Sequence, residues 1–277
     1  MPESRVWFVT GASKGIGLET VRAALLAGDR VVATSRRPAD FPEELRRRDD
    51  FLAVEMTIPD SNSIQNAVDQ ALDRFGRIDV VVNNAGYSLL GSVEELTDEA
   101  VRRNFDVNVM GVLAVQRAVL PIMREQRDGH VINLASISAS VTGPATGIYS
   151  ATKAAVLMIS EALAAEAAEL GIRVTAVCPG GVRTDFLDPS SSRGAEEGAQ
   201  SAYPRVRRAV AGYTGLNHNQ SGDPRLVGKA FVELSRMDSP PSRLYLGTDA
   251  LGALQSKLSQ VIDEANRYAR LSASISE

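Results

Sequence analysis

The sequence has a single cysteine, Cys178, and only two histidines, His130 and His218. One cysteine cannot form a disulfide within the chain, and its place at the end of an apolar run favours a buried thiol over a nucleophile. His130 stands at the start of a predicted strand and His218 lies in a polar stretch, so we expect both to be surface or loop residues. No cluster of metal ligands is expected from them, and the sequence predicts no metal site.

The sequence also lacks long runs of apolar residues and long runs of basic residues. No window reaches the roughly 18 uninterrupted apolar residues of a membrane span. The apolar stretch at residues 6–9 is too short for the core of a signal peptide. The net charge of −4 comes without a long basic stripe, which argues against binding to a nucleic-acid backbone. We therefore expect a cytoplasmic protein with neither a membrane nor a nucleic acid as partner.

Apolar runs bounded by turn residues alternate with helical patterns. The predicted strands are 5–10, 30–35, 51–55, 79–83, 130–135 and 173–178, and the predicted helices between them are 15–27, 42–48, 61–75, 98–125 and 149–170. Val- and Ile-rich runs suit strands buried on both faces of a parallel sheet, and the alternation implies right-handed crossovers. We predict one α/β domain over residues 1–277, a doubly wound Rossmann-type sheet flanked by helices.

The character changes after Thr184. Segment 187–222 is rich in Ser, Gly and Ala, and a loop of that length is usually a functional lid or a mobile segment. We favour a substrate lid. A helix at 224–235, a strand at 243–246 and a tail helix at 251–268, within a helical tail of about 250–271, complete the chain. The tail is expected to dock on the domain, with a subunit contact or closure of the pocket as alternatives.

The first predicted strand ends in a glycine-rich turn, Thr-Gly-Ala-Ser-Lys-Gly-Ile-Gly at residues 10–17. Glycines there let the backbone approach a pyrophosphate, and the following helix offers free N–H groups and the positive end of its dipole. The spacing differs from G-x-G-x-x-G, and such a turn alone can be purely structural. The candidate cofactor contacts in it are Gly11, Ser13, Lys14, Gly15, Ile16 and Gly17.

The end of the second predicted strand indicates which dinucleotide binds. It reads Ala-Thr-Ser-Arg-Arg at 33–37, without the carboxylate that would bind the ribose hydroxyls of NAD. Arg36 can hold a 2′-phosphate with two hydrogen bonds, and Lys14 can supply a second positive charge. For Arg37, a solvent-facing charge is an equal alternative. The pattern favours NADP(H) over NAD(H).

Tyr149 and Lys153 are four residues apart in a predicted helix, so their side chains share one face. A free tyrosine has a pKa near 10 and is a poor base at neutral pH, but a nearby ammonium lowers that pKa. The pair therefore suits proton exchange with a substrate oxygen. Taken alone, Tyr-x-x-x-Lys is common by chance.

Six motifs in one order strengthen this interpretation. The glycine turn, Asn-Asn-Ala-Gly at 83–86, Asn108, Ser136, the Tyr149 and Lys153 pair, and Pro179-Gly180 closely resemble the short-chain dehydrogenase/reductase family. The resemblance is strong over residues 5–186 and loose beyond them. It implies an oxidoreductase that transfers a hydride between a nicotinamide, here NADP(H), and a carbonyl or secondary alcohol.

The resemblance also implies a role for each matching residue. Tyr149 would be the general acid/base, Ser136 would orient the substrate oxygen, and Lys153 would bind the nicotinamide ribose and lower the tyrosine pKa. Asn108 would hold a water that links Lys153 to solvent. The other implied cofactor contacts are Asn83, Ala85 and Gly86 on the adenosine side and Pro179, Gly180, Val182 and Thr184 at the nicotinamide. Ser138 competes with Ser136 but lies two residues closer to Tyr149 than the family spacing.

The chain departs from the family pattern at two places. Where an Asp near the adenine is usual, it reads Val-Glu-Met-Thr at 54–57, so either Glu55 or the Met56 backbone would serve. The Asp-Gly-Gly ending common in tetrameric members is replaced by Tyr-Leu-Gly-Thr-Asp at 245–249. We expect a homo-dimer or homo-tetramer, with a dimer through the two long helices as a plausible form.

Alternative functions remain open. An NAD-linked alcohol dehydrogenase has the same core motifs, and a non-catalytic NADP(H)-binding regulator has the same fold. Such regulators generally lose a catalytic residue, whereas all four are present here. Ser136 has no nucleophile elbow around it, so a hydrolase is disfavoured. The expected substrate is a small carbonyl or alcohol in a pocket walled by 87–91, 138–146 and the lid, with apolar lining from Leu89, Leu90, Val141, Phe186 and Leu187.

Overall fold

A computed structural model describes residues 4–188, 191–194 and 201–275, so parts of the predicted lid, 189–190 and 195–200, lie outside the described residues. The strands of its main sheet are β1 (Val6–Val9), β2 (Arg30–Ser35), β3 (Phe51–Glu55), β4 (Val80–Asn83), β6 (Gly129–Leu134), β7 (Ile172–Pro179) and β9 (Arg243–Leu246). The helices are α1 (Gly15–Leu26), α2 (Glu43–Arg46), α3 (Ser61–Phe75), α4 (Asp98–Phe105), α5 (Gly111–Gln126), α6 (Gly147–Glu166), α7 (Pro204–Leu216), α8 (Pro224–Ser235), α9 (Thr248–Arg267) and α10 (Ala269–Ala273).

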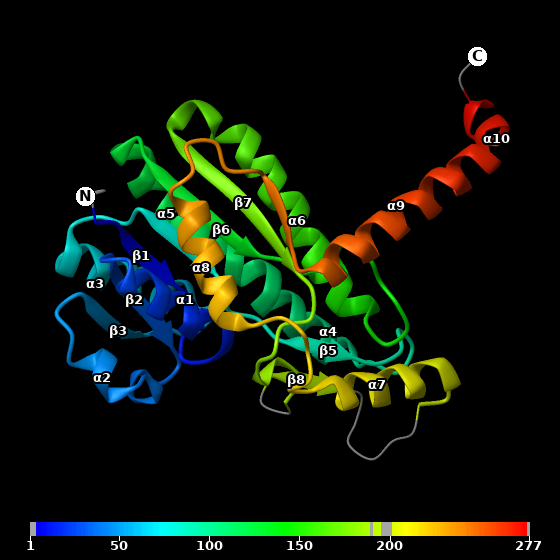
Figure 1. The fold of residues 1–277 in the computed structure, drawn as a ribbon, viewed down its shortest axis with the longest axis horizontal. Helices are drawn as coiled ribbons and strands as arrows, with labels where there is room; N and C mark the ends of the chain where they lie inside the picture. Colours follow the sequence, from blue (N-terminus) through cyan, green and yellow to red (C-terminus); the bar gives the residue numbers. More distant parts are fainter. Residues whose placement is uncertain (1–3, 189–190, 195–200, 276–277) are drawn as a thin grey trace.

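The seven strands form one parallel sheet in the order β3-β2-β1-β4-β6-β7-β9, with helices on both faces (Figure 1). The order changes direction between β1 and β4, which is the place where open α/β sheets bind ligands. The predicted doubly wound Rossmann-type fold is confirmed, and the predicted strands agree with the observed ones to within one residue at each end.

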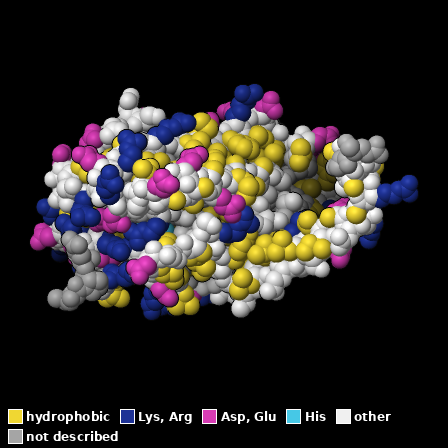
Figure 2. Space-filling view, turned by 90° about the horizontal axis from the view of Figure 1, so that it is seen from above, with side chains coloured by type: hydrophobic (Ala, Val, Ile, Leu, Met, Phe, Trp, Pro, Cys, Tyr) yellow, Lys and Arg dark blue, Asp and Glu magenta, His cyan; other side chains and the backbone are white. Residues whose placement is uncertain are grey.

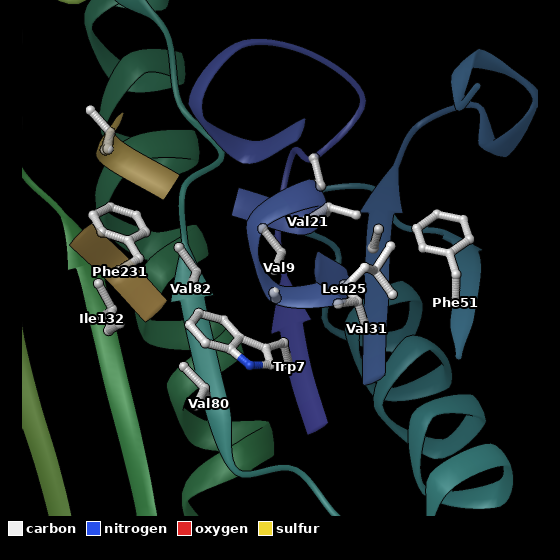
Figure 3. Close-up of a cluster of buried hydrophobic side chains, with 14 of the residues drawn as sticks. Trp7, Val9, Val21, Leu25, Val31, Phe51, Val80, Val82, Ile132 and Phe231 are labelled. Carbon is white, nitrogen blue, oxygen red and sulfur yellow. The ribbon is translucent and has the colours of Figure 1, made fainter. Parts of the chain in front are cut away.

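Side chains that alternate along the strands divide the core into two layers. In β1, Trp7 and Val9 pack with α1 and α8 on one face, and Phe231 of α8 belongs to the same cluster (Figure 3). Phe8 points to the opposite face, where α3 and α5 cover the sheet. Full burial of an apolar side chain of this kind stabilises the fold by roughly 1.5–3 kcal/mol. Both faces of the sheet are therefore buried, as the continuous apolar runs predict.

Two helical stretches are long and apolar enough to cross a membrane by length and composition alone, Asp98–Gln126 and Gly147–Glu166. Both pack on the sheet. Val115 and Val119 of α5 belong to the core layer that contains Phe8 of β1, and Val156 of α6 packs against β7. Their apolar character is thus used in covering the sheet.

The helix predicted over 98–125 is interrupted. Residues Asp106–Met110 form a π-helical turn between α4 and α5. Turns of this kind occur mostly as single insertions in α-helices and are frequent at functional sites. Asn108 lies in this turn and is buried, with 1% of its surface exposed.

Two short strands were not predicted. β5 (Ser88–Leu90) and β8 (Ser192–Gly194) form a small parallel sheet, in which the Ser88 and Ser192 hydroxyls are 2.8 Å apart. This sheet joins the predicted pocket wall to the predicted lid. Strands of three residues are too short to produce a recognisable alternation in the sequence.

The expectation that the tail helix docks on the domain is wrong. α9 begins beside β9 and then leaves the body of the protein, with α10 beyond it (Figure 1). Ala250 is the buried residue of α9, whereas Leu258 and Ile262 are more than half exposed. The apolar residues of this helix therefore cover nothing within the described part of the chain.

The expectation that His130 is a surface or loop residue is also wrong. β6 begins at Gly129, which places His130 inside the sheet, fully buried, with Nε2 3.0 Å from Thr175 Oγ1. Burial, and then the positive charges of Arg173 and Arg5, lower the pKa of His130 to about 3. The histidine is therefore neutral in the folded protein at neutral pH.

This burial predicts an acid sensitivity. In the unfolded chain His130 takes up a proton near pH 6.5, whereas the folded protein excludes that proton down to about pH 3, so stability falls as the pH falls through this range. Between pH 6.5 and 5, wild type should lose about 1–2 kcal/mol more free energy of unfolding than His130→Gln in urea titrations. His218→Gln, which alters an exposed histidine, should keep the wild-type pH dependence. Equal pH dependence in wild type and His130→Gln would refute this account.

Candidate active site

The predicted site residues lie at the carboxyl ends of neighbouring parallel strands. The glycine turn follows β1, residues 83–86 end β4, Ser136 follows β6, and residues 179–184 follow β7. Because parallel strands all end at the same edge of a sheet, these segments meet beside the β1–β4 position.

The glycine turn requires its glycines. Gly11 and Gly15 have φ angles of +61° and +58°, in the left-handed region that favours glycine. A Cβ atom on Gly11 would lie 2.9 Å from Cα of Ala85, and one on Gly17 would lie 2.6 Å from Nδ2 of Asn84. α1 then begins without a side-chain cap from Lys14. The turn therefore fits a dinucleotide phosphate, which the first N–H groups of α1 would bind.

Asn84 and Thr10 hold this turn, and sequence reasoning gave neither a role. Asn84 Nδ2 donates to the carbonyl oxygens of Thr10 and Gly11, both at 2.9 Å. The Thr10 hydroxyl accepts from the backbone N–H groups of Asn84 and Ala85, both at 3.0 Å. The sequence did offer a signal for the role of Asn84, because two asparagines stand side by side at 83–84. Neighbouring residues at the end of a strand point to opposite sides, so only one of the two side chains can face the core.

Asn83 points the other way. Its Nδ2 donates to Asn133 Oδ1 at 2.8 Å, and Asn133 Nδ2 donates to the Ser160 hydroxyl at 2.8 Å. This buried polar chain connects β4, β6 and α6. The Asn83 side chain is thus directed into the core, and its backbone is what remains to line a cofactor.

A polar hollow of about 440 Å³ lies at the end of β2, lined by Ser13, Ser35, Arg36, Arg37 and Asp40. Arg37 Nε is 3.1 Å from Asp40 Oδ2, so this arginine is already paired. Within the described residues, Arg36 has no such carboxylate. Lys14 does not line the hollow; its charge acts on Asp188 and contributes to the lowered pKa of that carboxyl.

The adenine side offers less than expected. The Met56 side chain lies in the core, and its N–H donates to the carbonyl of Ser35 at 2.9 Å, which leaves only the Met56 carbonyl for a ligand. Glu55 is the exposed neighbour.

Tyr149 and Lys153 both come from α6 and are buried, with Lys153 Nζ 5.9 Å from the centre of the tyrosine ring. Ser136 lies close enough to Tyr149 to lower the pKa of the tyrosine, and its hydroxyl accepts from the N–H of Ser138 at 3.1 Å. The structure thus places Ser136 beside the tyrosine, as the family spacing implies.

Burial dominates the electrostatics of this pair. It raises the pKa of Tyr149 above its usual value, against a smaller lowering by Ser136. It also lowers the pKa of Lys153 to about 8. Lys153 Nζ donates to the carbonyl of Leu134 at 2.7 Å. The family resemblance implies that Lys153 lowers the tyrosine pKa, but here removal of the phenol from water dominates, and the lowering that opposes it comes from Ser136.

Asn108 is held by backbone and side-chain bonds. Its Nδ2 donates to the carbonyl of Tyr87 at 3.0 Å and to the Thr152 hydroxyl at 3.1 Å, and its Oδ1 accepts from the N–H of Tyr87 at 3.1 Å. A Cβ atom on Gly86 would lie 3.0 Å from that Oδ1 and 3.7 Å from Lys153 Nζ. Gly86 thus brings Asn108 and Lys153 to the same small space.

The segment after β7 is fixed by Asp249, another residue without a predicted role. Asp249 Oδ2 accepts from the N–H of Gly181 at 2.7 Å, and a Cβ atom on Gly180 would lie 2.3 Å from the same carboxylate. Val182 pairs with Gly222 at the end of the predicted lid. Thr184 lies against the glycine turn, since a Cβ atom on Gly15 would be 3.4 Å from its side chain.

The substrate side is bounded by the predicted lid. The Phe186 ring is 5.8 Å from the Tyr149 ring, and Tyr213 of α7 is close enough to raise the pKa of Tyr149. Leu90, Val141 and Leu187 are half-buried around this space, whereas Leu89 is 1% exposed and belongs to the core.

Asp188 ties the two ends of the lid. It accepts from Asn217 Nδ2 at 2.5 Å and lies 3.0 Å from His218 Nε2. The ligand atoms of Asp185, Asp188 and His218 are within 4.8 Å of one another, so the expectation that His218 joins no group of metal-binding side chains is wrong. The hydrogen bond between His218 and Asp188 accounts for two of the three members of this cluster.

Residues 5–194 match the short chain dehydrogenase family. The oxidoreductase BOA17 of Botryotinia fuckeliana is 33% identical over 254 residues, which are 90% of each protein. A 3-ketodihydrosphingosine reductase of Bacteroides thetaiotaomicron is 34% identical over 248 residues, which are 88% of each.

Solved structures with a similar fold are consistent with these relatives. A short-chain dehydrogenase from Streptomyces avermitilis superposes with a TM-score of 0.90 at 34% identity, over 99% of this chain and 100% of the other. A serine dehydrogenase complexed with NADP+ has a TM-score of 0.74 at 26% identity, over 87% and 94% of the two chains. A 3-ketoacyl-(acyl-carrier-protein) reductase from Brucella melitensis, complexed with NADH, has a TM-score of 0.70 at 26% identity, over 88% and 97%. Neighbours of this fold thus bind nicotinamide cofactors of both kinds.

The hydrogen bonds between Asn84 and the turn after Thr10 predict that Asn84→Ala lowers the stability of the fold. Loss of the two Nδ2 bonds leaves carbonyls of the turn without a donor, so the free energy of unfolding should fall by about 1–3 kcal/mol in urea titrations. Asn219→Ala is the matched control, because that amide is exposed and makes only two 3.3 Å bonds within its own turn. Equal losses in the two variants would contradict the role of Asn84.

Proposed function

This chain belongs to the short-chain dehydrogenase family, and we propose that it is an NADP(H)-dependent oxidoreductase that interconverts a carbonyl and a secondary alcohol. The observation that carries this proposal is the buried group at the end of β6. Ser136 lies beside Tyr149 and lowers its pKa, and Lys153 Nζ lies 5.9 Å from the centre of the tyrosine ring on the same helix face. The four residues of the candidate tetrad, Asn108, Ser136, Tyr149 and Lys153, are gathered at one place.

A bound nicotinamide supplies the hydride, and the residues of this chain supply orientation and the proton. In reduction, the Tyr149 hydroxyl gives its proton to the substrate oxygen; in oxidation, the phenolate removes it. Ser136 orients that oxygen from the side of Tyr149. The phenol is protonated at neutral pH, as a tyrosine of ordinary pKa also is, and burial raises its pKa further, so the free protein holds the proton that carbonyl reduction requires.

Lys153 is the group suited to exchange protons near neutral pH, since its pKa is lowered to about 8. Its neighbour across Gly86 is Asn108. We assign to Asn108 the positioning of a water through which Lys153 recovers protons from solvent. The two hydrogen bonds between the side-chain amide of Asn108 and the main chain of Tyr87 hold that amide in place for this task.

The preference for NADP(H) rests on the hollow at the end of β2. Among the described residues Arg36 forms no ion pair, the one carboxylate that lines the hollow, Asp40, is paired with Arg37, and Ser13 and Ser35 line the same space. A 2′-phosphate carries charge that a guanidinium can bind through two hydrogen bonds. Arg37 is neutralised by Asp40, so Arg36 is the primary contact.

The pocket favours a hydrophobic ketone or the corresponding alcohol. Phe186 packs beside Tyr149, and Leu90, Val141 and Leu187 lie around the same space. One relative bears the name of a ketone reductase, which is consistent with this class. We retain the cytoplasm as the place of action and residues 187–222 as a substrate lid.

Tyr149→Phe tests the catalytic assignment. Without the hydroxyl no proton reaches the substrate oxygen, so NADPH oxidation over a panel of ketones and aldehydes should fall by roughly 10²–10⁴-fold, with NADPH affinity retained. Tyr268→Phe, a matched change on exposed α9, should keep full activity. Turnover by Tyr149→Phe would refute the role of the tyrosine. A wild-type protein that binds NADPH but reduces nothing on the panel would favour a non-catalytic regulator.

Arg36→Ala tests the cofactor assignment. Loss of a charge-assisted contact of roughly 1.5–3 kcal/mol should raise the Kd for NADPH by about 10–100-fold and leave the Kd for NADH nearly unchanged, as measured by fluorescence titration. Arg37→Ala should have a smaller effect, because Arg37 is paired with Asp40. An unchanged preference for NADPH in Arg36→Ala would overturn the assignment, and tighter binding of NADH than NADPH by wild type would favour the NAD-linked alternative.

A further inference from the structure

The projecting helix α9 carries an exposed apolar stripe. Six apolar residues of α9 and its C-cap recur at alternating intervals of three and four, at Leu251, Leu254, Leu258, Val261, Ala265 and the C-cap Tyr268, and Ile262 lies beside this row. Leu258 and Val261 are 51% and 45% exposed. Figure 2 shows hydrophobic side chains in a row where this helix leaves the body. Intervals of this kind are typical of the seam of a two-helix coiled coil, and such a row marks a protein or membrane contact.

The charges beside the stripe distinguish a protein from a membrane. A helix that lies on a membrane surface carries Lys and Arg along its polar face. Here Lys257 is followed by Asp263 and Glu264, and then by Arg267 and Arg270, so the signs are mixed. Mixed charges favour a partner helix with the complementary arrangement.

The α9 helix of a second copy has the complementary charges when it packs antiparallel to the first. In an antiparallel pair, Leu258 of one copy shares a layer with Val261 of the other, and Leu254 shares a layer with Ala265. Lys257 and Glu264 flank the seam at equivalent positions, so Lys257 of each copy then faces Glu264 of the other. In a parallel pair Lys257 would face Ile262, and the charges would find no partners.

We propose that two copies of this chain associate through α9, packed antiparallel. The base of α9 lies beside the 3-10 turn Ile137–Ala139, which directly follows Ser136. In the antiparallel pair the last turn of the second copy's α9 lies next to this base, since its Tyr268 shares a layer with Leu251. Each copy therefore extends a helix end toward the substrate side of the other.

Cysteine cross-linking tests the orientation directly. The double variant Leu254→Cys/Ala265→Cys should give a covalent dimer on oxidation, read on a non-reducing gel. Within one copy the two positions are about 16 Å apart along the helix, too far for a disulfide, and the native Cys178 is buried. Leu254→Cys alone should stay monomeric on the gel. Cross-linking of the single variant would indicate a parallel pair, and no cross-linking of the double variant would overturn the proposal.

A charge exchange tests the partner. Lys257→Glu and Glu264→Lys should each raise the Kd of the dimer about tenfold in sedimentation equilibrium, and the combined variant should restore the wild-type value. Asp263→Lys, the same charge change on the outer side of the helix, should leave the Kd unchanged. Absence of rescue, or an equal effect of Asp263→Lys, would refute the pairing. Binding of wild type to phosphatidylcholine–phosphatidylserine vesicles that Leu258→Glu abolishes would identify a membrane as the occupant instead.

Discussion

The hydrogen-bonded junction between Thr10 and Asn84 determines where the rest of the site lies. It ties the end of β1 to the end of β4, so closely that Gly11 has no room for a side chain beside Ala85. From this point α1 leads away on one side. On the other side the chain continues to Gly86, which brings Asn108 next to Lys153. This junction thus links the glycine turn to the segment that passes between Asn108 and Lys153.

Removal from water shapes the chemistry more than proximity of charge does. Tyr149 and Lys153 are buried together, and the same desolvation acts on both because each has one charged form. It moves the pKa of the phenol up and that of the ammonium down. The lysine, and not the tyrosine, therefore titrates near neutral pH, and the tyrosine is held in its acidic form.

The sheet was predictable because its strands are apolar on both faces and bounded by turn residues, and β2, β3 and β9 were located to the residue. The Tyr149 and Lys153 pair was expected from its spacing along the chain, whereas Asn108 and Ser136 were expected only from the resemblance to a family. His130 was misjudged although it lies in the predicted strand 130–135, because burial of a strand's first residues depends on the strands and helices packed around them, which a local pattern does not contain. Asn84 and Asp249 were missed because their roles are bonds to backbone groups distant in the sequence. The direction of α9 depends on what it packs against, which a helical pattern does not contain.

The bond from Gly181 to Asp249 spans 68 positions of the chain. During synthesis, at roughly 5–20 residues per second, the segment after β7 emerges seconds before the carboxylate that holds it. The first six strands of the sheet can pair in that interval, but the loop beside the reacting groups has no anchor yet. In a nascent chain that has not yet reached residue 249, the N–H of Gly181 would therefore lack this partner even where the earlier strands have already paired.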